Sequence, residues 1–117
     1  TFLSTPHVPH CWDAALFFDE TTRTLLCSAL FSHPGDPAPV IQGDVVGPAK
    51  DALLAGLAGP MKNDLPYTME TDATLARLAA LNPRTLALMH GSSFTGDGGT
   101  ALRDLARILK EALGAPR

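Results

Sequence analysis

The chain reads Ala14-Ala15-Leu16-Phe17-Phe18-Asp19-Glu20-Thr21-Thr22-Arg23-Thr24-Leu25-Leu26-Cys27-Ser28-Ala29-Leu30 in its first third. Two compact apolar runs, 14–19 and 24–30, lie on either side of the short polar segment 20–23. Two strand-length runs separated by so few polar residues are typical of a β-hairpin. The pattern therefore predicts two neighbouring antiparallel strands that begin a sheet.

Two helices are expected in the middle of the chain. The first covers 49–57, with Pro48 suited to its first turn and Gly59-Pro60 stopping it. The second is capped by Thr71 or Asp72 and ends at Asn82-Pro83. Between the hairpin and the first helix, residues 31–48 are rich in proline and glycine, so we expect a long irregular loop there.

The last third of the chain predicts one strand and one helix. Residues 85–89 form a short apolar run bounded by turn signals, which suits a buried strand. Asp97 or Thr100 then caps a final helix with an apolar stripe, and Gly114 follows its end. The order strand, strand, helix, helix, strand, helix predicts an α/β fold in which helices cover a sheet.

Composition narrows the classes of function. The 117 residues are 45% hydrophobic and 18% charged, which is typical of one globular domain. The net charge is -3 and no basic cluster is present, so nucleic acid and anionic membranes are not expected partners. No apolar run approaches the roughly 20 residues of a spanning helix. The two cysteines, Cys11 and Cys27, are too few for a disulfide framework and favour a cytoplasmic location.

Histidines follow or precede apolar runs at two places that are far apart along the chain. His7 and His10 lie just ahead of the first hairpin strand, and His90 follows the predicted strand 85–89. Imidazole is the commonest protein ligand for zinc and iron, and a histidine at a strand end is held by the sheet. These histidines are therefore candidate metal ligands, whereas His33 is expected to be an ordinary loop histidine, with a place at the rim of the pocket as the less favoured alternative.

Three segments together resemble the second half of the metallo-β-lactamase fold, in the di-iron branch that contains the flavodiiron proteins. His10-Cys11-Trp12-Asp13-Ala14 is similar to the ligand histidine of that branch, with its Trp-containing turn and following Asp. The hairpin 16–31 is similar to the family hairpin, and Met89-His90-Gly91 is similar to its final ligand histidine. The resemblance implies half of an αββα sandwich over residues 1–117.

The resemblance also implies roles for individual residues. His10 and His90 would belong to the metal site, with zinc or iron as the metal of an intact parent, although this chain could also hold none. Asp13 and His7 would orient or surround that site. His7 is the competitor of His10 for the ligand role, because Thr5-Pro6-His7-Val8-Pro9 resembles the Thr-Pro-Gly-His-Thr-Pro turn of other branches with one Gly missing.

Two departures from the family pattern limit what the resemblance implies. The early signature of the family, His-x-His-x-Asp-His, is absent from the sequence. In addition, the family's bridging Asp corresponds to Ala29, whose methyl group cannot bind a metal. Without that carboxylate, two neighbouring cations lose the anion that offsets their repulsion.

Two hypotheses follow from these observations. In the first, the chain is a fragment or degenerate member of the metallo-β-lactamase-like hydrolase and di-iron family, and it is not catalytically competent alone. In the second, it is a non-enzymatic α/β binding or assembly module that uses an exposed sheet edge. Both predict apolar surface that the missing N-terminal half or a second copy of the chain would cover, so we expect an oligomer.

Overall fold

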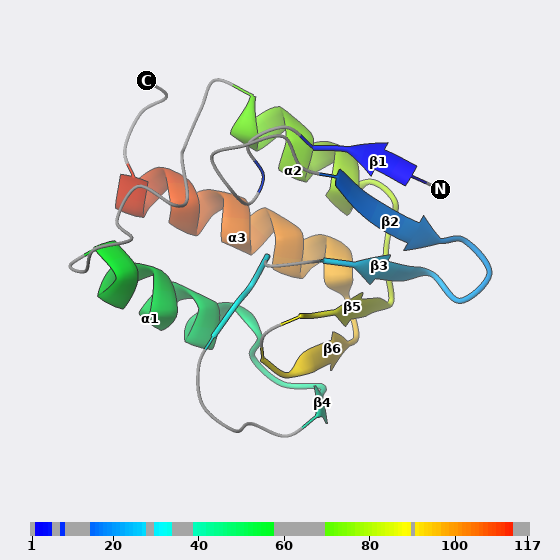
Figure 1. Ribbon diagram of the computed structural model, residues 1–117, viewed down its shortest axis with the longest axis horizontal. Helices are drawn as coiled ribbons and strands as arrows, with labels where there is room; N and C mark the ends of the chain where they lie inside the picture. The colour runs from blue at the N-terminus through cyan, green and yellow to red at the C-terminus, as the bar shows by residue number, and fades with distance from the viewer. Residues whose placement is uncertain are drawn as a thin grey trace.

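The computed structural model describes residues 2–5, 8, 15–27, 30–33, 39–57, 70–89 and 91–113. Within these residues the chain forms one six-stranded sheet and three helices (Figure 1). The elements are β1 (Phe2–Ser4), β2 (Ala15–Asp19), β3 (Thr24–Leu26), β4 (Val40–Ile41), α1 (Val46–Leu57), α2 (Thr71–Ala79), β5 (Thr85–Ala87), β6 (Ser93–Thr95) and α3 (Gly98–Leu113). The strand order is β1-β2-β3-β5-β6-β4. The predicted α/β class is confirmed.

The predicted hairpin is formed by β2 and β3, which pair antiparallel. Its turn is held by Asp19, whose carboxylate accepts hydrogen bonds from the backbone N–H of Thr21 and the hydroxyl of Thr22, both at 3.0 Å. Arg23 completes the turn with a φ of 56°. A short polar side chain that binds the backbone two residues on is a common way to fix such a turn.

One row of side chains forms the centre of the core. Phe18, Leu25, Leu86 and Phe94 stand opposite one another across β2, β3, β5 and β6, and all four are buried. They belong to one hydrophobic cluster that includes the inward residues of the helices. Side chains alternate between the two faces of a strand, so these four residues all point to the same face of the sheet. Since they pack against the inward residues of the helices, the helices cover that face.

The opposite face of the sheet carries a second, exposed row. Phe2 lies opposite Phe17, and Phe17 lies opposite Leu26. These side chains are 72%, 48% and 46% exposed, respectively. The described chain is therefore one sheet with a helical layer on one face only, which agrees with half of a layered sandwich.

The helical layer is centred on α3, which lies between α1 and α2 and contacts both (Figure 1). Its inward stripe is apolar and buried, and consists of Ala101, Leu102, Leu105, Ile108 and Leu109. Asp97 accepts a hydrogen bond from the backbone N–H of Thr100 at 3.0 Å, so the predicted cap at Asp97 is confirmed. A helix with this pattern gains most of its stability from packing its apolar stripe.

The sequence-based expectation for residues 31–48 is wrong in part. The segment contains β4 and the first turn of α1, which begins at Val46. The helix begins earlier than expected because Asp44 caps it. The Oδ1 atom of Asp44 accepts hydrogen bonds from the backbone N–H groups of Val46 and Gly47 at 2.9 and 2.8 Å. This is the hydrogen-bonding pattern of an N-cap, and it allows Pro48 to lie within the first turn.

The cap predicted for the second helix is also wrong. Glu70 occupies the N-cap position of α2, and Thr71 is already the first helical residue. Thr71 is 1% exposed, so its side chain is part of the interior. The helix ends close to the expected place, because Asn82 takes a left-handed φ of 53° just before Pro83.

Arg23 joins the hairpin turn to the end of α2. Its guanidinium donates hydrogen bonds to the backbone carbonyls of Leu81 and Asn82, and it lies 5.6 Å from the centre of the Phe18 ring. The backbone carbonyl of Arg23 also accepts a hydrogen bond from the N–H of Arg84 at 2.8 Å. These contacts bring the beginning of β5 beside the beginning of β3, and they provide a donor for two backbone carbonyls that follow the end of α2.

In the part of the chain that the structure describes, no helix has both the length and the apolar character needed to cross a bilayer.

Candidate functional site

The candidate site lies at one edge of the sheet, where three segments meet. β3 and β5 are parallel neighbours, with Leu26 opposite Ala87, so both strands end at this edge. β2 is antiparallel to β3 and therefore begins there. The backbone N–H of Cys27 continues the pairing to the carbonyl of Ala87 at 2.9 Å. We call this place, where the ends of the two central strands β3 and β5 meet, the β3–β5 edge.

The predicted site residues belong to segments next to this edge in the chain, but they lie outside the described residues. This applies to His7, His10, Asp13, Ala29 and His90. The structure does describe the residues that flank them in the chain. Ala15 begins β2, Cys27 directly follows β3, and Gly91 and Ser92 lie between β5 and β6. The strand topology brings these flanks to the same edge.

His33 is the histidine that the structure does describe, and it is not a solvated loop residue. Its side chain is buried, with an exposed fraction of 9%. Nδ1 lies 3.0 Å from the carbonyl oxygen of Phe31, and Nε2 accepts a hydrogen bond from the backbone N–H of Ser92 at 3.0 Å. A carbonyl can only accept, so Nδ1 carries the proton and Nε2 presents its lone pair to Ser92. The ring is therefore neutral, with both nitrogens used.

The sequence-based reading of His33 as an ordinary loop histidine missed this role. Its two ring partners are backbone groups, and the more distant one lies 59 residues further along the chain. A hydrogen bond to a backbone N–H leaves no residue-type signature at the partner position. The only signal in the sequence was Gly91, because a glycine can mark a place where another part of the chain approaches the backbone closely.

Gly91 is needed for the approach of this imidazole. Its φ is +128°, a conformation that L side chains rarely adopt. A Cβ at this position would lie 2.3 Å from Cε1 of His33, and 2.6 Å from each ring nitrogen. The next residue, Ser92, is 2% exposed. The ring of His33 thus fills the space directly beside the backbone of residue 91.

Cys27, just after the end of β3, is a side chain of the core. It is fully buried, and its Sγ lies 3.5 Å from the carbonyl of Leu25. Burial raises the pKa of this thiol far above its usual value, because the charged thiolate would be desolvated. The thiol stays protonated, as expected for a small buried apolar side chain.

Among the described residues, no group of three or more His, Cys, Asp or Glu side chains could hold a metal ion. His33 and Cys27 are the described residues of these types nearest to the β3–β5 edge in the chain, and both are otherwise engaged. The described residues at this edge therefore do not form a metal site by themselves.

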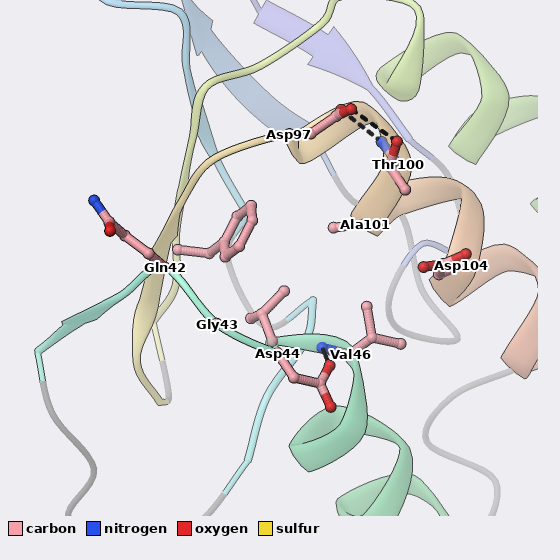
Figure 2. A pocket seen from close by; sticks show the side chains of 10 residues that line it. Gln42, Gly43, Asp44, Val46, Asp97, Thr100, Ala101 and Asp104 are labelled. Carbon is pink, nitrogen blue, oxygen red and sulfur yellow. Dashed lines mark hydrogen bonds between the residues drawn. The ribbon is translucent and has the colours of Figure 1, made fainter.

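A cavity of about 280 Å³ lies between the sheet and the helices at the opposite end of the strands, where β4 and β6 end (Figure 2). Its lining includes Phe94 and three carboxylates, those of Asp44, Asp97 and Asp104. Two of the three already serve the fold, because Asp44 caps α1 and Asp97 caps α3. We therefore interpret these two carboxylates as parts of the helix starts.

Asp97 predicts a pH dependence of stability. Hydrogen bonds from the backbone N–H and the hydroxyl of Thr100 hold the pKa of Asp97 below its ordinary value of 3.8. Because its pKa is lowered in the folded state, the ionised Asp97 carboxylate stabilises the fold at pH values above its ordinary pKa. This stabilisation is lost as the pH falls through the pKa of Asp97 in the folded state. We expect Asp97→Asn to lose less stability than the unmodified protein between neutral pH and pH values below 3.8. Urea unfolding at several pH values would measure this, and parallel curves would contradict it.

Comparison with solved structures identifies neighbours in fold. The chain is similar to the apo state of the chemotaxis sensor ODP from T. denticola, with a TM-score of 0.56 and 14% identity over 80% of this chain. It is also similar to a structure described as a peroxy diiron species of the chemotaxis sensor ODP, with a TM-score of 0.54 and 15% identity over 89% of this chain. At this level of identity, the similarity shows the fold alone.

The match covers 38% and 40% of the two ODP chains, so this chain spans about two fifths of the length of the solved structures. No family model matches the sequence, and no curated protein does.

Proposed function

We propose that this chain is the second half of a metallo-β-lactamase-like domain of the di-iron branch, and that it is a degenerate or incomplete member. In this proposal His10 and His90 bind a metal, zinc or iron, while Asp13 and His7 orient the ligands. The observation that supports it best is the topology of the β3–β5 edge. The start of β2 and the ends of β3 and β5 lie together there, and they flank these residues in the chain.

The fold neighbours support the same proposal. One of them is described as a diiron species, which is the chemistry of the branch that the sequence resembles. When bound in a protein, such metals lower the pKa of a coordinated water or carry redox chemistry. The role of this chain's own residues would be to hold and orient the ions from one side of the site.

Ala29 is the reason why we expect only weak metal binding. In the family the corresponding residue is an Asp that bridges two metals, and a methyl group supplies neither a ligand nor a negative charge. Two histidines are too sparse a set for a closed metal site, which usually has four ligands. We therefore propose weak or single-metal binding and no catalysis by the chain alone.

Restoring the carboxylate tests this proposal. We expect Ala29→Asp to bind Zn²⁺ or Fe²⁺ at least about tenfold more tightly than the unmodified protein, the size of effect typical of one group that supports a metal. Metal content after dialysis and competitive titration with a chelator would measure it. The matched control is Ser28→Asp, which adds the same charge one residue away.

The proposal also requires that the histidines contribute. Adding His90→Ala to the Ala29→Asp protein should abolish the gained metal binding. Equal binding by the Ala29→Asp and Ser28→Asp proteins would show that the added charge alone attracts metal, and would contradict the proposal.

A second candidate function is favoured by the exposed row of Phe2, Phe17 and Leu26. These side chains stand in register on three neighbouring strands, and the described residues place no helix over them. Contiguous apolar surface of this kind marks an interaction site. We propose as the alternative that the chain is an assembly module, and that its uncovered sheet face, in place of the sheet edge expected from the sequence, packs on a second copy or on the missing half.

Metal analysis together with light scattering on the same preparations separates the two candidates. A stable dimer with no bound metal in either the unmodified or the Ala29→Asp protein would favour the module. Metal binding that appears only in the Ala29→Asp protein would favour the degenerate metal site, whatever the oligomeric state. We also place the protein in the cytoplasm as part of this proposal, because Cys27 is a buried free thiol.

A further inference from the structure

We propose that the uncovered face of the sheet forms a symmetric dimer with a second copy of this chain. The two sheets pack face to face, and the two-fold axis runs parallel to the strands, between β3 and β5. This inference rests on the second candidate function, in which the uncovered face is an assembly surface. It adds one partner and one register to that function.

The exposed row of Phe2, Phe17 and Leu26 continues across the whole described sheet. The six strands lie side by side in the order β1-β2-β3-β5-β6-β4 (Figure 1). The strand register places one residue of each strand in line on the uncovered face. In spatial order these residues are Phe2, Phe17, Leu26, Ala87, Ser93 and Val40. We call these six residues the extended row.

Large and small side chains occupy different halves of the extended row. The half on β1, β2 and β3 consists of two phenylalanines and a leucine, all of them exposed. The other half begins with Ala87 and Ser93, which are small and partly exposed, and ends with the exposed Val40. The face is therefore raised over β1, β2 and β3, and it is low over β5 and β6.

A two-fold axis parallel to the strands makes this face complementary to itself. Such an axis reverses the order of the strands in the second copy and keeps the two extended rows in line. Phe17 then lies over Ser93 of the second copy, and Leu26 lies over Ala87 of the second copy. Each large side chain meets a smaller one, which allows two packed sheets to interdigitate. The contact is isologous, so each of these pairs occurs twice.

An axis in the same plane but perpendicular to the strands gives a poor fit. It stacks Phe17 on Phe17 of the second copy and Ala87 on Ala87 of the second copy. The two raised halves would then collide while the two low halves stayed apart, and both overpacking and voids are unfavourable. The distribution of side-chain sizes therefore selects the axis parallel to the strands.

The next row on the same face brings no like charges together. It consists of Asp19, Thr24, Thr85 and Thr95, which lie opposite one another on β2, β3, β5 and β6. The proposed axis places Thr24 over Thr85 of the second copy, and Asp19 over a threonine hydroxyl that can donate to it. Among the described strand residues that point to this face, Asp19 alone is charged. An almost uncharged face fits an equally uncharged partner, and a second copy provides one.

The area of the extended row fits a weak dimer. An aromatic side chain carries roughly 150–250 Å² of surface, so the exposed parts of Phe2 and Phe17 carry roughly 200–300 Å² together. Leu26 and Val40 raise the patch to several hundred Å², the size that marks an interaction site on a monomer. Interfaces below about 1,200 Å² in total belong to weak complexes, so we expect a Kd on the order of 10–100 μM.

Sedimentation equilibrium tests this proposal, at protein concentrations from well below to well above the expected Kd. We expect the unmodified protein to show a monomer–dimer equilibrium. Leu26→Ser should weaken the dimer at least about tenfold, because it removes an apolar side chain at the centre of the interface. The matched control is Leu54→Ser. Leu54 is 46% exposed, as Leu26 is, but it belongs to α1, so this variant should stay within about twofold of the unmodified protein.

NMR on a dimer mixed from isotope-labelled and unlabelled copies tests the register. Phe17 and Ser93 lie three strand spacings apart within one chain, which is roughly 14 Å and too far for a nuclear Overhauser effect. The proposed axis brings the Phe17 ring of one copy onto Ser93 of the other. We therefore expect intermolecular effects between these two residues, and none between the two Phe17 rings.

The other outcomes contradict separate parts of the proposal. A monomer at all concentrations would overturn the second copy as the occupant of the face, and the assembly function would then require a different chain. A dimer that Leu26→Ser and Leu54→Ser affect equally would contradict assembly through the uncovered face, and the second candidate function would fail with it. A dimer weakened by Leu26→Ser alone, with effects between the two Phe17 rings, would keep that function and overturn the proposed axis.

Discussion

Leu25→Ala is expected to lower the free energy of unfolding by about 3 kcal/mol, the usual cost of removing a buried leucine side chain. Leu25 has an exposed fraction of 0% and stands between Phe18 and Leu86 in the buried row. Removing its side chain leaves a cavity in the centre of the contact between sheet and helices, and its neighbours in β2 and β5 lose packing. Urea unfolding followed by circular dichroism would measure the change.

The next residue in the same strand is the matched control. Leu26 is 46% exposed because it points to the uncovered face of the sheet. Leu26→Ala should therefore cost less than about 1 kcal/mol, since only a partly buried side chain is removed. Equal costs for the two variants in the monomer would contradict the assignment of the two faces. A large cost for Leu26→Ala that appears only in a dimer would instead locate the dimer interface on the exposed row.

Gly91→Ala is the second substitution with a large expected effect, about 3 kcal/mol of destabilisation from backbone strain and overlap together. The φ of +128° is unfavourable for any side chain. The added Cβ would also lie 2.3 Å from Cε1 of His33, so the ring would have to move and the hydrogen bond to Ser92 would be lost. The same unfolding measurement applies.

A double-mutant cycle separates the two causes. In a His33→Ala background the overlap is removed, so Gly91→Ala should cost only the share of the backbone conformation, about 1–2 kcal/mol. Gly43 is the control, because an added Cβ there would meet nothing within 4 Å. Gly43→Ala should change stability by no more than about 0.5 kcal/mol. If Gly91→Ala costs the same with and without the His33 ring, the close contact between the two residues is contradicted.

Several elements of the fold could be predicted because their signals are local. The hairpin of β2 and β3 follows from two apolar runs around a short polar turn, and the final helix follows from an apolar stripe of regular period and a capping Asp97. By contrast, β4 and β6 have only two and three residues, too few for a periodic pattern to show. They exist because each pairs with a neighbouring strand that lies far away in the sequence or across a turn.

The candidate site divides in the same way. Residue types, their order and the family resemblance led to the prediction of His10 and His90 as ligands and of Ala29 as a departure, and these stay predictions because the three residues lie outside the described part of the chain. The structure adds the reason why distant segments can act together, since the parallel pairing of β3 and β5 brings their ends to one edge.

The role of His33 depended on tertiary structure. Its type and its neighbours in the chain are those of an ordinary loop histidine, and its partners are a backbone carbonyl and a backbone N–H. Every residue except proline carries both groups, so no sequence pattern marks them. Only the folding of residues 31–33 against residues 91 and 92 makes this histidine buried, neutral and fixed in place.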